Sequence, residues 1–212
     1  HKNKAANASD NFGAGKPVVS ELGKRIFFVT GEPGCGKSTF LAALIQKFNL
    51  QPSGFITKKE AAPSEVAVYM HPVIDGTARY RYATGNRVGI CSPPKPAGFA
   101  PVFDACGVMC LKQAETALQQ SVLPVILMDE LGVMEAEAER FFLAVCALFS
   151  NPRYYIIGTV KPRGTRFLPV LEQMPEAAVF HLTLQNRAEL YAQLERAQNF
   201  AAFLETASIK GR

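Results

Sequence analysis

Residues 31–38 read Gly31-Glu32-Pro33-Gly34-Cys35-Gly36-Lys37-Ser38 and match the phosphate-binding pattern G-x-x-x-x-G-K-S/T. A short apolar run at 25–30 predicts a buried strand before this loop. Apolar residues at helical spacing predict a helix over 38–48 after it. The glycines let backbone N–H groups turn inward and form an anion-binding concavity, and the helix N-terminus adds its positive end. We therefore predict that this loop binds phosphates.

Three side chains of the loop have individual predicted roles. Lys37 can reach the β- and γ-phosphate oxygens, and the Ser38 hydroxyl can hold Mg²⁺. Thr39 is a further, weaker contact candidate. The alternative for the whole stretch is a glycine-rich turn with an exposed lysine, but that alternative does not explain the strand and helix on either side.

A second apolar strand, predicted at 124–128, ends in Asp129-Glu130. Enzymes with a phosphate loop use an acid at such a position to orient Mg²⁺, so Asp129 is the predicted metal-side residue. Glu130 stands where a carboxylate can hold a water in line with the γ-phosphorus. A strand-end acid could instead cap the next helix.

Apolar strands alternate with helices over residues 24–205, which predicts one α/β domain with a mostly parallel sheet covered on both faces. Two strands around an Asp75-Gly76 turn predict a small β-hairpin insertion. The expected strands are 25–30, 54–58, 65–71, 79–84, 124–128, 154–160 and 179–184. The expected helices are 38–48, 103–119, 135–149, 165–174 and 186–204.

Composition and charge restrict the function further. The apolar fraction of 48% with 19% charged residues excludes a wholly disordered chain. Of the net charge of +5, residues 1–25 and 205–212 carry +4, and the ends at 1–23 and 206–212 read as basic tails. We therefore expect no nucleic-acid partner.

The longest apolar run, 141–149, is too short for the ~20 residues of a membrane span, and no early segment resembles a secretory signal. Five cysteines, an odd number, favour a reducing compartment, the cytoplasm.

The acidic strand end carries a resemblance to a known family. Residues 129–135 read Asp-Glu-Leu-Gly-Val-Met-Glu and are similar to the D-E-I/L-G-x-M-E segment of the nucleoside-triphosphatases first described from thermophiles and also called cancer-related NTPases. The agreement spans most of 26–195. It implies a three-layer RecA-like fold with a phosphate loop. It also implies Mg²⁺-dependent hydrolysis of ATP, GTP and other nucleoside triphosphates with loose base selectivity.

The resemblance also suggests roles for residues outside the two motifs. Glu135 matches the last acid of the family segment and is a candidate catalytic or water-positioning residue; the alternative is an exposed glutamate in the first turn of a helix. Lys161 stands where family members commonly have His, and it could contact the γ-phosphate or part of the transition-state charge. A solvated Lys161, with Arg163 in that role, is the alternative. Asn186 and Arg187 could border the nucleotide or could be a helix cap and a surface arginine.

Two other functions are compatible with a phosphate loop. One is a kinase that passes the γ-phosphate to a small acceptor, although no Arg-rich lid segment stands out. The other is a nucleotide-dependent switch or assembly factor with little turnover, acting on an unidentified protein partner. The N-K-x-D pattern of guanine-specific switches and the L-S-G-G-Q signature of ABC subunits are both absent from the sequence.

Overall fold

The computed structural model describes residues 23–91 and 95–207. Its strands form one nine-stranded sheet of order β6-β5-β3-β2-β7-β8-β1-β9, with β4 paired to β3. From β2 to β9 along this order the neighbours are parallel, and from β2 outward to β6 they are antiparallel. The strands are β1 (Ile26–Thr30), β2 (Ser53–Ala62), β3 (Glu65–Ile74), β4 (Thr77–Ala78), β5 (Arg87–Ile90), β6 (Ala97–Gly98), β7 (Val125–Leu131), β8 (Tyr155–Val160) and β9 (Ala177–His181).

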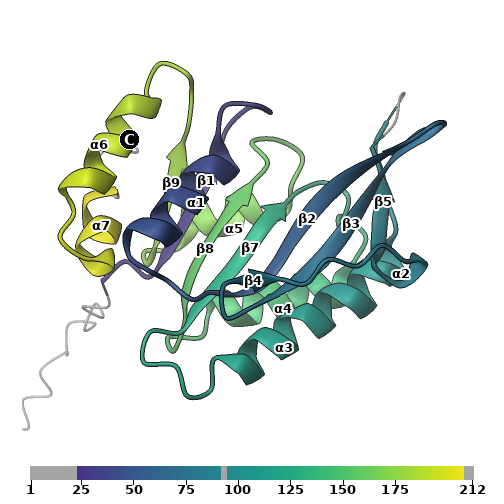
Figure 1. Cartoon of the computed structure of the whole chain (residues 1–212), viewed down its shortest axis with the longest axis horizontal. Coiled ribbons are helices and arrows are strands. Elements are labelled where there is room, and N and C mark those ends of the chain that lie inside the picture. The colour runs from purple at the N-terminus through teal and green to yellow at the C-terminus, as the bar shows by residue number, and fades with distance from the viewer. Residues whose placement is uncertain (1–22, 92–94, 208–212) are drawn as a thin grey trace, which may run out of the picture.

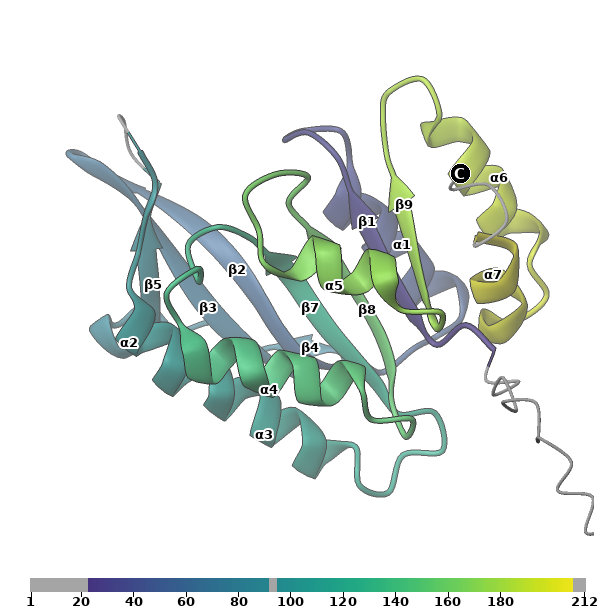
Figure 2. The ribbon, with the colours of Figure 1, turned by 180° about the vertical axis from the view of Figure 1, so that it is seen from behind.

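Helices cover both faces of the sheet, which confirms the predicted three-layer α/β fold. On one face lie α3, α4 and α5 (Figure 2), and on the other lie α1, α6 and α7 (Figure 1). The helices are α1 (Lys37–Lys47), α2 (Ala100–Val102), α3 (Val108–Ala117), α4 (Glu139–Phe149), α5 (Phe167–Gln173), α6 (Arg187–Arg196) and α7 (Phe200–Ala207), and a π-helical turn (Phe103–Gly107) joins α2 to α3.

Two cores lie on opposite faces of the same strands because successive strand side chains alternate. On β1, Phe28 points into the core under α4, where its ring meets Phe149 edge-on at 5.8 Å. Its neighbour Phe27 points to the other face and meets Phe203 of α7 at 5.1 Å. Such a pair of apolar faces fixes the register of β1, because a shift by one residue would exchange them.

The predicted strand at 79–84 is wrong. The Asp75-Gly76 turn is present with both residues at positive φ, but β4 contains only two residues before the chain leaves β3. The backbone N–H of Arg81 then donates to Nδ1 of His71 at 3.1 Å, and the Tyr82 ring lies edge-on to His71 at 5.0 Å. The tyrosines of this segment therefore pack against side chains of β3, while β5 pairs with its edge.

Two predicted helices differ as well. The helix predicted at 135–149 begins only at Glu139, because the residues before it form a turn. The helix predicted at 186–204 is two helices, α6 and α7. The break is stabilised by Asn199, whose side-chain oxygen accepts a 2.9 Å hydrogen bond from the Ala202 N–H at the start of α7. The helix predicted at 103–119 begins with the π-helical turn, so α3 itself starts five residues later, at Val108; the other predicted elements are present with ends displaced by up to four residues.

The predicted tails at 1–23 and 206–212 lie mostly outside the described residues. Within the described residues α7 continues to Ala207. No helix there has the length and apolar character needed to cross a membrane.

Candidate active site

The phosphate loop joins the carboxyl end of β1 to the N-terminus of α1, which begins at Lys37. Gly31, Gly34 and Gly36 have φ values of 144°, 81° and 102°, a region that favours glycine. At Gly31 there is also no space for a side chain, because a Cβ would lie 2.3 Å from the carbonyl oxygen of Leu182. The loop is therefore a backbone structure that only this glycine spacing permits.

The side chains of the loop divide between the core and the solvent. Cys35 is buried on the α1 face of the sheet, so it anchors the loop and does not line the phosphate side. The Lys37 ammonium group donates to the carbonyl oxygens of Gly31 at 2.8 Å and Glu32 at 3.1 Å, which holds it over the loop. The cavity over the loop, about 350 Å³ in volume, is lined by Gly31, Pro33, Gly34, Gly36, Lys37, Ser38, Thr39, Lys59, Glu130, Lys161 and Pro162.

Asp129 lies beside the loop, as the sequence predicted for the metal-side acid. Its Oδ1 accepts a hydrogen bond from the Ser38 hydroxyl at 3.2 Å and another from the Thr159 hydroxyl at 2.6 Å. Thr159 is fully buried on β8, the strand between β1 and β7, and sequence reasoning did not select it as a site residue. The one signal for it was a hydroxyl within an otherwise apolar strand.

The donor chemistry at Ser38 and Asp129 fits a magnesium ion. Mg²⁺ prefers oxygen ligands and takes only one or two from the protein when phosphates and waters complete its shell. No cluster of three or more His, Cys, Asp or Glu side chains able to hold a metal occurs in the part of the chain that the structure describes. A hydroxyl and a carboxylate next to a phosphate loop are therefore the oxygen pair with which such an ion could be held.

Glu130 and Lys161 face each other across the ends of β7 and β8. The Lys161 Nζ lies 3.4 Å from Oε1 of Glu130, and both side chains are partly buried. Both residues also line the cavity over the phosphate loop. Arg163, the competing candidate, is instead exposed and paired with Glu32 at the outer side of the loop. The structure thus brings Lys161, and not Arg163, to the carboxylate.

Glu135 is not the exposed glutamate of a first helical turn that the sequence left open. It precedes α4, is only 3% exposed, and its carboxylate accepts a hydrogen bond from the backbone N–H of Gly132. Burial raises the pKa of Glu135 to about 7, and the nearby Glu130 raises it too, although the Gly132 N–H and Lys161 oppose the shift. Near neutral pH this buried acid therefore exists in both protonation states.

A second cavity continues from the loop cavity. It has a volume of about 390 Å³ and shares four residues with the loop cavity: Ser38, Lys59, Glu130 and Lys161. We call it the inner cavity. Its remaining walls are Thr57, Val68, Cys91, Pro96, Phe103, Asp129, Gly132, Val133, Met134 and Glu135.

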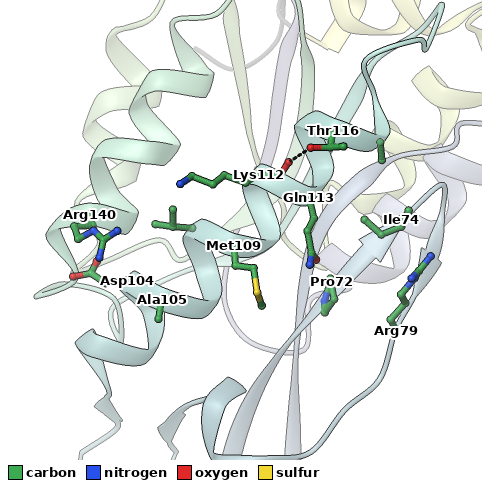
Figure 3. A pocket seen from close by; sticks show the side chains of 12 residues that line it. Pro72, Ile74, Arg79, Asp104, Ala105, Met109, Lys112, Gln113, Thr116 and Arg140 are labelled. Carbon is green, nitrogen blue, oxygen red and sulfur yellow. Dashed lines mark hydrogen bonds between the residues drawn. The ribbon is translucent and has the colours of Figure 1, made fainter.

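A larger hollow of about 920 Å³ lies elsewhere, between α3 and β3 (Figure 3). Side chains of α3 such as Met109 and Gln113 extend there toward Pro72 and Ile74 (Figure 3). None of its lining residues belongs to the predicted site, so size alone does not locate the chemistry.

Asn186 and Arg187 lie beyond the end of β9. The Asn186 side chain accepts from the Thr183 N–H at 2.8 Å and donates to the His181 carbonyl at 2.8 Å, so it braces the turn before α6. The Arg187 side chain is exposed but approaches the loop, since a Cβ on Gly36 would lie 3.8 Å from its guanidinium nitrogen. Asn186 stands at the N-cap position of α6, but its side chain makes no capping hydrogen bond to the helix, so the predicted cap is wrong and the side chain stabilises the preceding turn instead. Arg187 borders the phosphate loop.

Comparison with known proteins identifies the family of this chain. A sequence model of the family described as NTPase matches residues 26–194, most of the chain. The chain belongs to this NTPase family. It is 23% identical over 164 residues to the nucleoside-triphosphatase THEP1 of Aquifex aeolicus, which covers 75% of this chain and 90% of that protein. It is 27% identical over 189 residues to a cancer-related nucleoside-triphosphatase homolog of Bos taurus, and this alignment covers 80% of this chain and 94% of that protein.

Solved structures of the family have the same fold. The crystal structure of THEP1 from Aquifex aeolicus matches with a TM-score of 0.57 at 21% identity, covering 81% of this chain and 99% of that one. The solution structure of a human cancer-related nucleoside triphosphatase matches with a TM-score of 0.52 at 22% identity, covering 84% of this chain and 100% of that one. The predicted family, fold and enzyme class, a nucleoside-triphosphatase, are confirmed.

Proposed function

We propose that this NTPase hydrolyses ATP, GTP and other nucleoside triphosphates to the diphosphate and phosphate, with Mg²⁺ and with little base selectivity. The observation that carries the proposal is the convergence of Lys37, Ser38, Asp129 and Glu130 on one phosphate loop. Those residues supply the positioning and charge stabilisation that phosphoryl transfer requires.

Each group of the site has a proposed part in the reaction. The backbone N–H groups of residues 31–39 and the N-terminus of α1 bind the phosphate chain. Lys37 exchanges its contacts with the Gly31 and Glu32 carbonyls for β- and γ-phosphate oxygens. Ser38 and Asp129 would hold the magnesium ion, which supplies charge neutralisation between the β- and γ-phosphates when bound. Thr159 fixes the rotamer of Asp129 through its 2.6 Å hydrogen bond.

Glu130 is the residue that we propose holds the attacking water. A carboxylate can accept a proton from water and orient it, and Glu130 lines the loop cavity where the γ-phosphate would end. The Lys161 ammonium group, 3.4 Å from Oε1 of Glu130, pairs with that carboxylate and adds positive charge on the γ side. Glu135 contributes a second carboxyl beside this water and is the secondary candidate.

Loose base selectivity is supported by where the specific contacts lie. The loop cavity is lined by phosphate-loop residues together with Lys59, Glu130, Lys161 and Pro162, groups that suit a phosphate chain rather than one particular base. We also propose that residues 24–205 act as one domain, since the two cores share a single sheet, and that the protein works in the cytoplasm, since all five cysteines are unpaired.

Phosphate release from ATP, GTP, CTP and UTP, each with Mg²⁺ or with EDTA, tests the proposal, with Lys37→Ala as the control. We expect release from all four with Mg²⁺, none with EDTA, and a loss of about 10³-fold in the variant, because the β- and γ-phosphates lose their main cation. Release from one nucleotide alone would contradict loose selectivity. Undiminished release in the variant would contradict the site.

A further inference from the structure

The inner cavity is larger than hydrolysis requires. A hydrolase has to admit one water beside the γ-phosphate, and a water occupies only ~30 Å³ of liquid volume. The inner cavity has about 390 Å³, within the size range of small-molecule sites. Ser38, Lys59, Glu130 and Lys161 line both cavities, and the proposed function puts the γ-phosphate beside these four residues.

The walls of the inner cavity show what chemistry it could bind. Both of its cations, Lys59 and Lys161, are shared with the loop cavity, where the proposed function would place the phosphate charge. The walls that belong to the inner cavity alone contain no lysine or arginine, so they do not favour an anion; their two carboxyl groups are Asp129 and Glu135. These walls are apolar at Val68, Phe103 and Met134. Such a lining favours an uncharged molecule with an apolar or aromatic body.

Polar groups also line the inner cavity. They are the Thr57 hydroxyl and the Asp129, Glu130 and Glu135 carboxyls, of which Glu130 is shared with the loop cavity. A hydroxyl group on the bound molecule would find hydrogen-bond partners in them and would lie next to the phosphoryl group. The lining therefore fits one particular ligand shape, with an apolar body at the inner end and a hydroxyl at the γ-phosphate end.

The cavity walls are closely packed where β6 meets the turn after β7. A Cβ on Gly98 would lie 1.7 Å from the carbonyl oxygen of Met134, and a Cβ on Gly89 would lie 2.8 Å from the Met134 sulfur. The backbone of Cys91 is fixed by a 2.8 Å hydrogen bond from its N–H to the Val66 carbonyl. The outer antiparallel strands thus form a well-packed wall of the inner cavity, and this wall has no part in the proposed phosphate chemistry.

We propose that the inner cavity binds a small neutral alcohol with an apolar or aromatic body and presents its hydroxyl to the γ-phosphate as an acceptor. In this reaction the hydroxyl oxygen bonds to the γ-phosphorus, and the bond from that phosphorus to the β–γ bridging oxygen breaks. The nucleoside diphosphate leaves, a phosphate monoester forms, and the hydroxyl proton passes to solvent. The inference rests on the proposed nucleotide site and adds a second substrate to it.

The test measures how the γ-phosphate divides between water and an added alcohol. The full chain is incubated with Mg²⁺ and γ-labelled ATP in the presence of benzyl alcohol, adenosine or uridine, with glycerol at equal concentration as the polar control. Labelled ester and labelled phosphate are then separated. We expect ester from at least one of the three probes at ten or more times the yield with glycerol.

A substitution at Cys91 tests whether the acceptor binds in the inner cavity. Cys91 lines that cavity and is absent from the loop cavity. Cys91→Phe fills the space and should reduce ester formation at least tenfold while phosphate release stays within twofold, which also shows that the variant is folded. Cys91→Ser, which keeps the size of the side chain, should retain ester formation.

Three results would overturn the proposal: label in phosphate alone with all three probes, equal ester yields with glycerol, or ester formation that Cys91→Phe leaves unchanged. Each leaves the hydrolase intact, because phosphate release continues in all of them. The absence of both labelled products from the parent protein would instead overturn the proposed function.

Discussion

The two halves of the sheet differ in what they contribute. The parallel half, β7, β8, β1 and β9, carries every residue predicted for phosphate chemistry, either at a strand end or in the segment that follows. The outer antiparallel half, β3, β5 and β6, carries none of them, yet it supplies part of the inner cavity through Val68, Cys91 and Pro96.

The difference follows from strand direction. Parallel strands end at the same edge of a sheet, so short motifs far apart in the sequence meet there. Asp129 thus reaches Ser38 although 91 residues separate them. Antiparallel strands have no such common carboxyl edge, and the outer strands act through the wall they build. We therefore propose that the parallel half performs the phosphate chemistry and that the outer half determines what else can approach it.

The largest effect is expected at Glu135, where the two halves meet. The fold raises the pKa of this carboxyl to about 7 from an ordinary value near 4.5, so the native state holds the proton more tightly than the unfolded chain. Its contribution to stability is therefore highest at pH 4.5 and falls as the pH rises to 7, by about 3 kcal/mol. Glu135→Gln is neutral throughout and can still accept from the Gly132 N–H.

Thermal unfolding of the parent and Glu135→Gln from pH 4.5 to 8 measures this effect. We expect equal stability near pH 4.5 and a variant that is more stable by up to about 3 kcal/mol above pH 7, a rise in Tm of roughly 6–12 °C. A difference between the two proteins that does not change with pH would show that the carboxyl is not buried as described.

A smaller effect is expected in the outer half alone. Gly98→Ala places a Cβ against the Met134 backbone, and such overpacking should destabilise the protein by about 2 kcal/mol. Gly85→Ala is the matched control, because nothing lies within 4 Å of a Cβ there. Denaturant unfolding compares the two variants. If Gly98→Ala is as stable as Gly85→Ala, the outer wall is not packed tightly enough to shape the inner cavity.

The sequence predicted the parallel half well because its signals are local. The glycine spacing of the loop and the acid after an apolar strand each specify a backbone geometry within a few residues. The Ser38–Asp129 contact then follows from parallel strand direction. The sequence could not predict which side chain contacts Asp129 from the neighbouring strand. Thr159 makes this contact because β8 lies between β1 and β7.

The outer half was predicted less well because its order depends on tertiary packing. Residues 79–84 have the tyrosine alternation of a strand, but their rings pack on His71 and Tyr69, and β5 takes the edge of β3. Tertiary contacts override β-propensity in this way where one edge has two candidate strands. The burial of Glu135 was equally hidden, because the sequence places it at the start of an expected helix and the structure places it in the turn before α4.

The most direct test of the account compares binding and cleavage in Glu130→Gln. Nucleotide affinity is measured by titration with a fluorescent ATP analogue, and cleavage is measured in a single turnover with Mg²⁺-ATP. We predict an affinity within about twofold of the parent, because the amide keeps the shape of the side chain. We predict cleavage slower by about 10²-fold, because the amide cannot accept the water proton. Cleavage at the parental rate would contradict the central claim that Glu130 positions the attacking water.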